Sequence, residues 1–270
     1  MIVIASAGLS DIGRKRHSNQ DAFLMDDAHG LYVVADGMGG HQAGEVASQI
    51  VVDAIHQYYV ASPPDADQET TRHDPSLSPD ANRLREAIHY ANQKVYQAAA
   101  DNKAYQGMGS TLAAVHFSRN TFIAANVGDS PIYLIHENAI ETLSVPHTLM
   151  AEQQEFHPED QTLFSPDLRH MLTRGMGVED TVQPDICESP CFGGDRLVVC
   201  SDGLSGKVTP EEIRAVVAAH SAPDACQKLI EMANQRGGDD NITALVLHVH
   251  TANTLFQRLS HWFGRMTGNN

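Results

Sequence analysis

Aspartates recur at the ends of apolar segments in this chain. Asp36 follows "LYVVA", Asp129 follows "AANVG" and Asp202 follows "RLVVCS", so three carboxylates come just after expected strands. Asp21 and Asp240 come just before two further apolar segments. In an antiparallel sheet, the end of one strand and the start of its neighbour lie at the same edge. The spacing therefore predicts that these aspartates gather at one edge of a sheet.

Turn capping explains any one of these aspartates, since an Asp side chain bonds nearby backbone amides. It explains less well a whole set of junctions that each border a buried strand. Several carboxylates share a small volume only when a cation offsets their charge. All-oxygen ligand sets suit Mg²⁺ or Mn²⁺, and a pair of such ions turns a bound water into a nucleophile at neutral pH. The pattern therefore predicts a two-metal hydrolytic site.

The glycine-rich segment "DGMGGHQAG" begins at Asp36 and invites comparison with phosphate-binding loops. Gln42 stands where a dinucleotide fingerprint would place its third glycine after Gly37 and Gly39. A P-loop with Gly-Lys-Ser/Thr at the required spacing does not occur either. We interpret the glycines as room for close backbone approach, which would let the Gly37 carbonyl reach a metal beside Asp36.

Arg16 lies five residues before Asp21 in "GRKRHSNQD". A guanidinium beside an anionic metal site binds an anion through two parallel hydrogen bonds, and that anion is typically a phosphate. The alternative is a solvent-exposed basic turn, because Arg14 and Lys15 are adjacent to Arg16. The spacing alone leaves both interpretations open.

The composition excludes several classes of protein. With 270 residues and 42% hydrophobic content, the chain can form one large core or two modest domains. A net charge of −16 disfavours a nucleic-acid partner. No apolar run is long enough to span a bilayer, and the short N-terminal run, which lacks a basic start, indicates a strand and not a signal peptide. Four cysteines without a C-x-x-C pair are typical of reduced thiols, so we expect a cytoplasmic location.

Strand and helix patterns occur in separate blocks, which indicates an α+β fold with antiparallel sheets. Helical spacing predicts helices over 43–60 and 82–102, separated by a mobile loop over 61–82 that is rich in Pro, Asp and Ser. Apolar segments over 109–144 predict a meander of strands. Residues 146–180 show no clear periodicity, which predicts an irregular excursion on the surface.

The last third of the chain contains clear helix signals. Thr209 as N-cap, Pro210 at the first helical position and two following glutamates predict a helix start. A second helix is expected to stop at Gly237, and "NITALVLHV" predicts a final strand. The tail over 251–270 has apolar residues near helical spacing, which predicts a helix packed on the body. The alternative is that this tail docks to a partner or to a membrane surface, and only its two arginines support that interpretation.

Taken together, the motifs resemble those of the metal-dependent Ser/Thr protein phosphatases (the PPM or type 2C family) in their bacterial form. Seven segments from about Ser10 to Val249 match in the family's order, which makes a chance match very unlikely. They are "SDIGRKRHSNQDAF", "VVADGMGGHQAGEVAS", "GMGSTLAAV", "ANVGDSPIYLI", "LTRGMG", "DRLVVCSDGL" and "GGDDNITALVL". The resemblance implies one catalytic domain over 1–250 with an αββα sandwich, a flap over about 146–180, and two Mn²⁺ or Mg²⁺ ions at one edge.

The resemblance also implies a role for each residue of the acidic set. Asp36 would bridge both ions, and the Gly37 carbonyl would bind one of them. Asp202 and Asp240 would bind the other ion. Asp21 would act mainly through a metal-bound water.

Further expected roles belong to Arg16, which would hold the substrate phosphate, and Asp129, which would hold a third, weaker ion. Two departures from the family pattern weaken the case for that third ion. Pro131 stands where Arg is frequent, and Gly206 stands where Asp or Asn is frequent. Met38 occupies the position of a histidine found in eukaryotic members, so the general acid stays unassigned.

The expected activity is hydrolysis of phosphoserine and phosphothreonine in proteins by a metal-activated water, without a phosphoenzyme. A bacterial Ser/Thr kinase and its targets are the partners that the resemblance implies, with a regulator of sigma factors as another possible substrate.

One rival is a catalytically silent module of the same fold that binds a kinase or substrate. The complete acidic set argues against it. Another rival, a two-metal phosphodiesterase or nuclease, is disfavoured by the acidic balance and the lack of an aromatic-basic groove.

Overall fold

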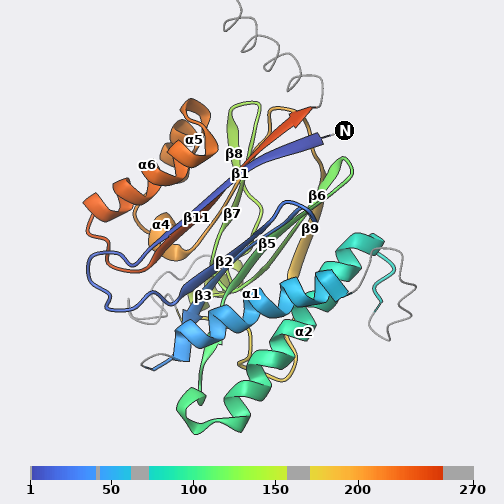
Figure 1. Ribbon diagram of the computed structural model, residues 1–270, viewed down its shortest axis with the longest axis vertical. Helices are drawn as coiled ribbons and strands as arrows, with labels where there is room; N and C mark the ends of the chain where they lie inside the picture. The colour runs from blue at the N-terminus through green and yellow to red at the C-terminus, as the bar shows by residue number, and fades with distance from the viewer. Residues whose placement is uncertain (1, 41–42, 62–72, 157–170, 252–270) are drawn as a thin grey trace, which may run out of the picture.

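Two antiparallel β-sheets lie at the centre of the molecule, and helix pairs cover their outer faces (Figure 1). The computed structural model describes residues 2–40, 43–61, 73–156 and 171–251. One sheet has the order β1-β11-β10-β7-β8, with strands β1 (Ile2–Asp11), β7 (Ile132–His136), β8 (Ala139–Thr142), β10 (Arg196–Cys200) and β11 (Ile242–Thr251). The other has the order β2-β3-β5-β6-β9, with strands β2 (Asp21–Asp26), β3 (Leu31–Met38), β5 (Leu112–Ser118), β6 (Thr121–Val127) and β9 (Asp185–Pro190). The short strand β4 (Gly109–Ser110) pairs with β3. The predicted α+β class is confirmed.

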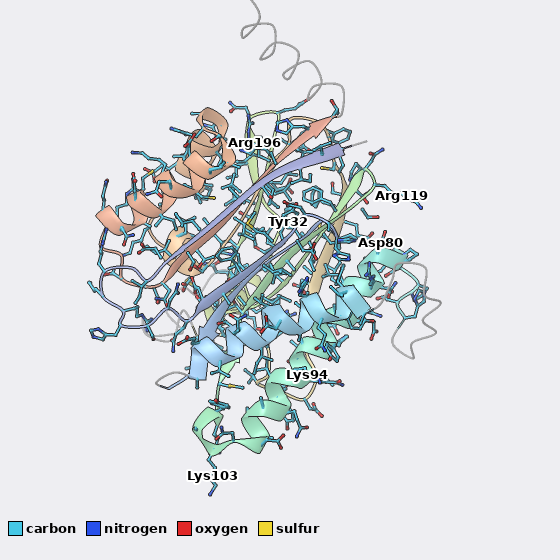
Figure 2. The ribbon with its side chains drawn as sticks, in the orientation of Figure 1. Tyr32, Asp80, Lys94, Lys103, Arg119 and Arg196 are labelled. Carbon is cyan, nitrogen blue, oxygen red and sulfur yellow. The ribbon has the colours of Figure 1, made fainter. Side chains whose placement is uncertain are left out.

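Strand alternation divides the apolar residues into three layers. Tyr32 and Val34 of β3 pack with Leu245 and other residues of the opposite sheet, and Tyr32 lies between the sheets in Figure 2. The intervening residues of β3, such as Val33, face the helices instead. Because successive side chains of a strand point to opposite faces, a central strand buried on both sides is apolar throughout.

The helices cover the sheets in two pairs. Helices α1 (Ala43–Ala61) and α2 (Pro79–Asp101) pack against each other, and α1 packs on β2 and β3. Helices α5 (Pro210–Ala219) and α6 (Ala222–Gln235) cover the other sheet, where α6 packs on β1 and β11. The predicted start of α5 is confirmed, because Thr209 forms a reciprocal capping box with Glu212.

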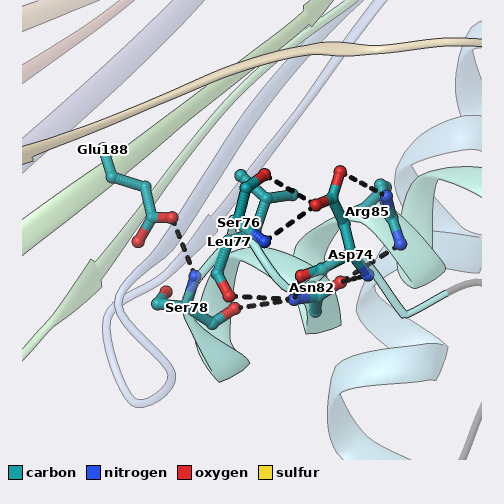
Figure 3. A network of polar contacts seen from close by, with 7 residues as sticks. All are labelled: Asp74, Ser76, Leu77, Ser78, Asn82, Arg85 and Glu188. Atoms are coloured by element: carbon teal, nitrogen blue, oxygen red, sulfur yellow. Dashed lines mark hydrogen bonds and ion pairs between the residues drawn. The ribbon is translucent and has the colours of Figure 1, made fainter.

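Helix α2 begins earlier than the sequence pattern predicts. Residues 79–82, assigned to the loop over 61–82, form the first turn of α2, and Ser78 caps it with a 3.1 Å bond from the Ala81 amide. The preceding turn is held by polar contacts (Figure 3), in which Asn82 bonds backbone groups of Asp74, Leu77 and Ser78. Residues 62–72 lie outside the described part of the chain.

The predicted meander over 109–144 is wrong in one respect, because β6 and β7 belong to different sheets. The chain crosses from one sheet to the other between Val127 and Ile132. Gly128 adopts φ +96° at this crossing, a left-handed conformation that favours glycine. Besides β5, the strand that pairs with β6 is β9, which the sequence pattern did not predict.

The described part of residues 146–180, which is 146–156 and 171–180, is less irregular and less superficial than predicted. It contains the helix α3 (Leu149–Phe156), and both His147 and Met176 are buried. Met176 exchanges two backbone hydrogen bonds with Ser110, so this segment is anchored beside β4. Residues 157–170 and the predicted tail helix over 252–270 lie outside the described residues. Among the helices that are described, none has the length and apolarity needed to cross a membrane.

Candidate active site

Strand register brings two of the predicted site residues face to face. Asp21 at the start of β2 pairs directly with Asp36 near the end of β3. Asp36 lies two residues after Val34, which faces the other sheet, so the alternation of β3 directs Asp36 to the same side. The central apolar layer therefore ends in carboxylates at this edge.

The opposite sheet contributes Asp202 and Asp240 to the same edge. Asp202 begins the short helix α4 (Asp202–Ser205), two residues after the end of β10, and Asp240 lies two residues before the start of β11. The backbones approach closely here, since a Cβ on Gly203 would lie 1.9 Å from the Asn241 carbonyl oxygen. Only glycine at position 203 allows the segment that carries Asp202 to approach the segment that carries Asp240 so closely.

A cleft of about 610 Å³ opens at this edge of the sandwich. Six of the seven residues predicted for the site line it: Arg16, Asp36, Gly37, Asp129, Asp202 and Asp240. The seventh, Asp21, lies behind the cleft surface. The structure thus gathers residues from both sheets and from the loop before β2 into one hollow.

Asp21 has one satisfied oxygen and one unsatisfied oxygen. Its Oδ2 accepts hydrogen bonds from Ser201 Oγ at 2.8 Å and from Thr243 Oγ1 at 2.6 Å. Its Oδ1 is buried and accepts no hydrogen bond from the described residues. An orphaned buried carboxylate oxygen is costly unless a cation or a bound water reaches it, so this side chain fits a metal site.

The raised pKa values of two carboxyl groups at this edge also fit a metal site. Burial raises the pKa of Asp36 well above its ordinary value, and the charges of Asp21, Asp202, Asp240 and Asp129 raise it further. Burial also raises the pKa of Asp21 to about 6, although the hydroxyl bonds from Thr243 and Ser201 lower it. Divalent cations would offset this accumulation of negative charge.

The donor set suits hard cations. Among the described residues, no three Asp, Glu, His or Cys side chains already surround one point closely enough to hold an ion. The carboxylates would therefore have to draw together around a cation, which would also take carbonyl and water oxygens, as Mg²⁺ commonly does.

Gly37 lies where three backbone segments pack closely together. A Cβ at this position would lie 1.9 Å from the Gly44 carbonyl oxygen of α1 and 2.7 Å from the Gln20 carbonyl oxygen. The Gly37 amide donates to the same Gln20 oxygen at 3.0 Å. Position 37 therefore excludes any side chain, and it fixes the end of β3 against both α1 and the loop before β2.

Arg16 reaches the cleft from the loop before β2, with its Nη2 donating to Asp240 Oδ2 at 2.7 Å. This bond is the main cause of its raised pKa. Asn241 holds the loop in place, because its side chain donates to the Ile12 and Ser18 carbonyls at 3.0 Å and accepts from the Gln20 amide at 2.8 Å. The guanidinium is half exposed and has five donors, so one bond to Asp240 leaves others for a ligand.

The sequence pattern did not predict several residues that support the site. Ser201 and Thr243 orient Asp21, and Asn241 orients the Arg16 loop. Thr111 Oγ1 accepts from the Asp36 amide at 3.0 Å and bonds Ser130 Oγ at 2.7 Å. The sequence signal that could have located these supporting residues is a polar residue inside or beside an otherwise apolar strand, as in "VVCSDG" and "NITALVL".

Residues 171–178 form another wall of the cleft. Arg174 lies on this wall, where its Nη1 donates to Asp185 Oδ1 and to the Gln183 carbonyl at 3.1 Å each. His147 contacts the same Asp185 through Nε2 at 3.1 Å, and its Nδ1 accepts from the Gly128 amide at 3.0 Å. Burial lowers the pKa of His147, so this histidine is a neutral structural link and not a ligand.

Two antiparallel sheets flanked by helix pairs, with an acidic cleft at one edge, define an αββα sandwich. The family model described as protein phosphatase 2C matches residues 8–246. The chain is 34% identical to the serine/threonine phosphatase stp of Listeria welshimeri, over 88% of this chain and 93% of that one. It is 32% identical to the protein phosphatase PhpP of Streptococcus pneumoniae, over 90% of this chain and 96% of that one.

A solved structure agrees with these sequence matches. The catalytic domain of the serine/threonine phosphatase PstP, in complex with two manganese ions, superposes with a TM-score of 0.78 at 29% identity, covering 93% of this chain and 100% of that one. The chain therefore belongs to the protein phosphatase 2C family. Its activity is that of a bacterial Ser/Thr protein phosphatase.

Proposed function

We propose that the acidic edge binds two Mn²⁺ or Mg²⁺ ions, with Asp36 shared between them. Asp202 and Asp240 would complete one ion's protein ligands, and the Gly37 carbonyl would serve the other. The observation that carries this assignment is the convergence of carboxylates from both sheets at one edge, with Asp21 Oδ1 buried and unsatisfied. When bound, the two cations would lower the pKa of a coordinated water and offset charge on the phosphate.

The chain's own side chains would position the substrate and hold the centre together. Arg16 would bind two non-reacting phosphate oxygens through parallel hydrogen bonds, which gives both charge and orientation. Asp21 would accept a hydrogen bond from a water in the centre through Oδ1, while Ser201 and Thr243 fix its other oxygen. Asp129, on the cleft wall, would hold an additional and weaker cation.

The substrates we assign are proteins phosphorylated on serine or threonine, as the names of the relatives indicate. The wide cleft supports this assignment, since it can admit a residue attached to a polypeptide. We propose that the enzyme reverses the action of a Ser/Thr kinase. A cytoplasmic location stays a prediction from the sequence.

The test is hydrolysis of p-nitrophenyl phosphate and of a phosphothreonine peptide with Mn²⁺, with Mg²⁺ and with chelator. We expect metal-dependent turnover of both substrates by the wild-type protein. In Asp36→Asn, we expect turnover to fall by about 10²-fold or more, because a ligand shared by both cations is lost. Near-normal turnover in that variant would contradict the metal assignment. Absence of turnover in a wild-type protein that binds Mn²⁺ would favour a silent binding module.

A further inference from the structure

A second hollow of about 530 Å³ lies next to the catalytic cleft, at the C-terminal end of α2. Tyr96 and Ala99 of α2 form one wall, Met108 lies at the floor, and Val178 forms the opposite wall. Tyr96 and Val178 are both solvent-exposed, at 41% and 56%. Exposed large apolar side chains around a hollow indicate a site for an apolar ligand group.

The hollow adjoins the catalytic cleft, because Gly107 and Val178 line both of them. Gly107 adopts φ +77°, and a Cβ placed on it would meet nothing within 4 Å. No side chain therefore stands at this position on the shared border, and a polypeptide held in the cleft by its phosphorylated residue lies close to the hollow.

The wall opposite α2 is fixed in place before any ligand arrives. The Gly177 amide donates to Asn92 Oδ1 at 2.7 Å, and Asn92 Nδ2 donates to the Glu179 carbonyl at 3.0 Å. Asn92 is itself buried in α2, so these bonds clamp the segment that carries Val178 onto the helix. A preformed hollow binds a side chain at a lower entropic cost than one that must be assembled.

The charge around the hollow also suits a phosphorylated protein. The chain carries a net charge of −16, yet none of the nine described residues lining this hollow is acidic. Lys103 borders it, and Figure 2 shows this lysine just beyond the end of α2, pointing away from the body. A phosphopeptide, which is an anion, meets less repulsion here than elsewhere on the surface.

We propose that this hollow is a substrate subsite that accepts a large apolar side chain near the phosphorylated serine or threonine. The inference rests on the proposed function, since it places the phosphorylated residue in the acidic cleft. It goes beyond that function by assigning a sequence preference to the enzyme. Substrates with an aliphatic or aromatic residue at one fixed distance from the phosphorylated residue are then hydrolysed faster than substrates without it.

The test is a positional scan with phosphothreonine peptides. A single Leu or Phe is moved through each flanking position of an otherwise Ser- and Ala-based peptide, and kcat/KM is measured with Mn²⁺. We expect a maximum at one position, about fivefold to tenfold above the peptide without an apolar residue, because an open hollow gives less than a closed pocket. The same scan uses p-nitrophenyl phosphate as a substrate that cannot reach the hollow.

Two variants test whether the hollow causes the preference. Tyr96→Ala removes one wall, and Ala100→Glu places a carboxylate at the rim without disfavouring the helix. Both should abolish the maximum and leave p-nitrophenyl phosphate turnover within about twofold of wild type. The matched controls are Phe192→Ala and Ala218→Glu, which make the same types of change at exposed positions outside both hollows and should keep the maximum.

The outcomes separate the subsite from the catalytic assignment. A flat scan in the wild-type protein, or a maximum that persists in both Tyr96→Ala and Ala100→Glu, would overturn the subsite while metal-dependent turnover of p-nitrophenyl phosphate still supports the two-metal phosphatase. Loss of p-nitrophenyl phosphate turnover in the wild-type protein would instead contradict the proposed function.

Discussion

Buried carboxylates lie at opposite ends of the sandwich, and their surroundings differ. Asp195 directly precedes β10, and its side chain is 4% exposed. It contacts His136 Nδ1 at 2.7 Å and accepts from the Phe192 amide at 2.8 Å. At the other end of the same strand, Asp202 joins Asp21 and Asp36. Burial raises the pKa of both Asp21 and Asp36, and the charge of Asp202 raises both further.

The difference separates a structural carboxylate from a functional one. The protein itself supplies the partners of Asp195, so this end of the sandwich is complete without a ligand. The acidic edge concentrates several negative charges in one place. Arg16 is the arginine of the cleft lining that bonds one of these carboxylates, Asp240. Native proteins retain uncompensated charge mainly where a ligand offsets it, so the comparison predicts opposite responses to mutation and to metal at the two ends.

The largest expected contrast is in catalysis. Asp202→Asn should lower kcat/KM for p-nitrophenyl phosphate by about 10²- to 10³-fold, the usual cost of removing a group that stabilises transition-state charge. Asp195→Asn should leave kcat/KM within about twofold, because Asp195 lies at the far end of β10. Steady-state kinetics with saturating Mn²⁺ measure both. Comparable losses in the two variants would show that the far end also shapes the active site.

The next contrast is in stabilisation by metal. At a Mn²⁺ concentration of a hundred times Kd, the free energy of unfolding should rise by about 2.7 kcal/mol relative to protein in chelator. Asp36→Asn should lose most of this gain, whereas Asp195→Asn should keep it. Urea unfolding with Mn²⁺ and with chelator gives the comparison. A gain that survives in Asp36→Asn would place the metal elsewhere.

A smaller effect is expected in the metal-free proteins at neutral pH. Asp36→Asn removes a destabilising charge and should raise the free energy of unfolding, since the pKa of Asp36 is raised in the folded state. Asp195→Asn weakens charge-assisted hydrogen bonds and should lower it by about 1–3 kcal/mol. Urea unfolding in chelator tests the signs, and two changes of the same sign would remove the distinction drawn here.

The smallest effect concerns the pH dependence of the Asp195 end. The hydrogen bond to Asp195 raises the pKa of His136 above its ordinary value. The stability that this pair contributes is therefore full below the unfolded pKa of about 6.5, and it is lost as pH rises through the folded pKa. His136→Gln should accordingly destabilise the protein more at pH 5.5 than at pH 9. The rings of His136 and Phe192 are also in contact, and we treat this contact as uncharged and independent of pH. If His136→Gln lowers the free energy of unfolding equally at pH 5.5 and pH 9, the effect belongs to that ring contact and not to the bond with Asp195.

Local chemistry made much of the fold predictable. Apolar segments located β2 and β3, and the Thr209 cap located the start of α5, because both signals act over a few residues. The sheet to which each strand belongs was not predictable in the same way. The crossing at Gly128 depends on packing between sheets, and the burial of His147 depends on partners 19 and 38 residues away.

Residue types and their order along the chain were enough to predict which residues gather at the cleft: aspartates at strand ends, glycines beside them and Arg16 in a short basic loop. These are matters of residue type and strand polarity, which are local. The bonds from Ser201 and Thr243 to Asp21, the bonds from Asn241 to the Arg16 loop, and the hollow beside α2 became visible only in the folded molecule. Those features arise where segments from distant parts of the chain pack together, and no periodicity within any one segment encodes them.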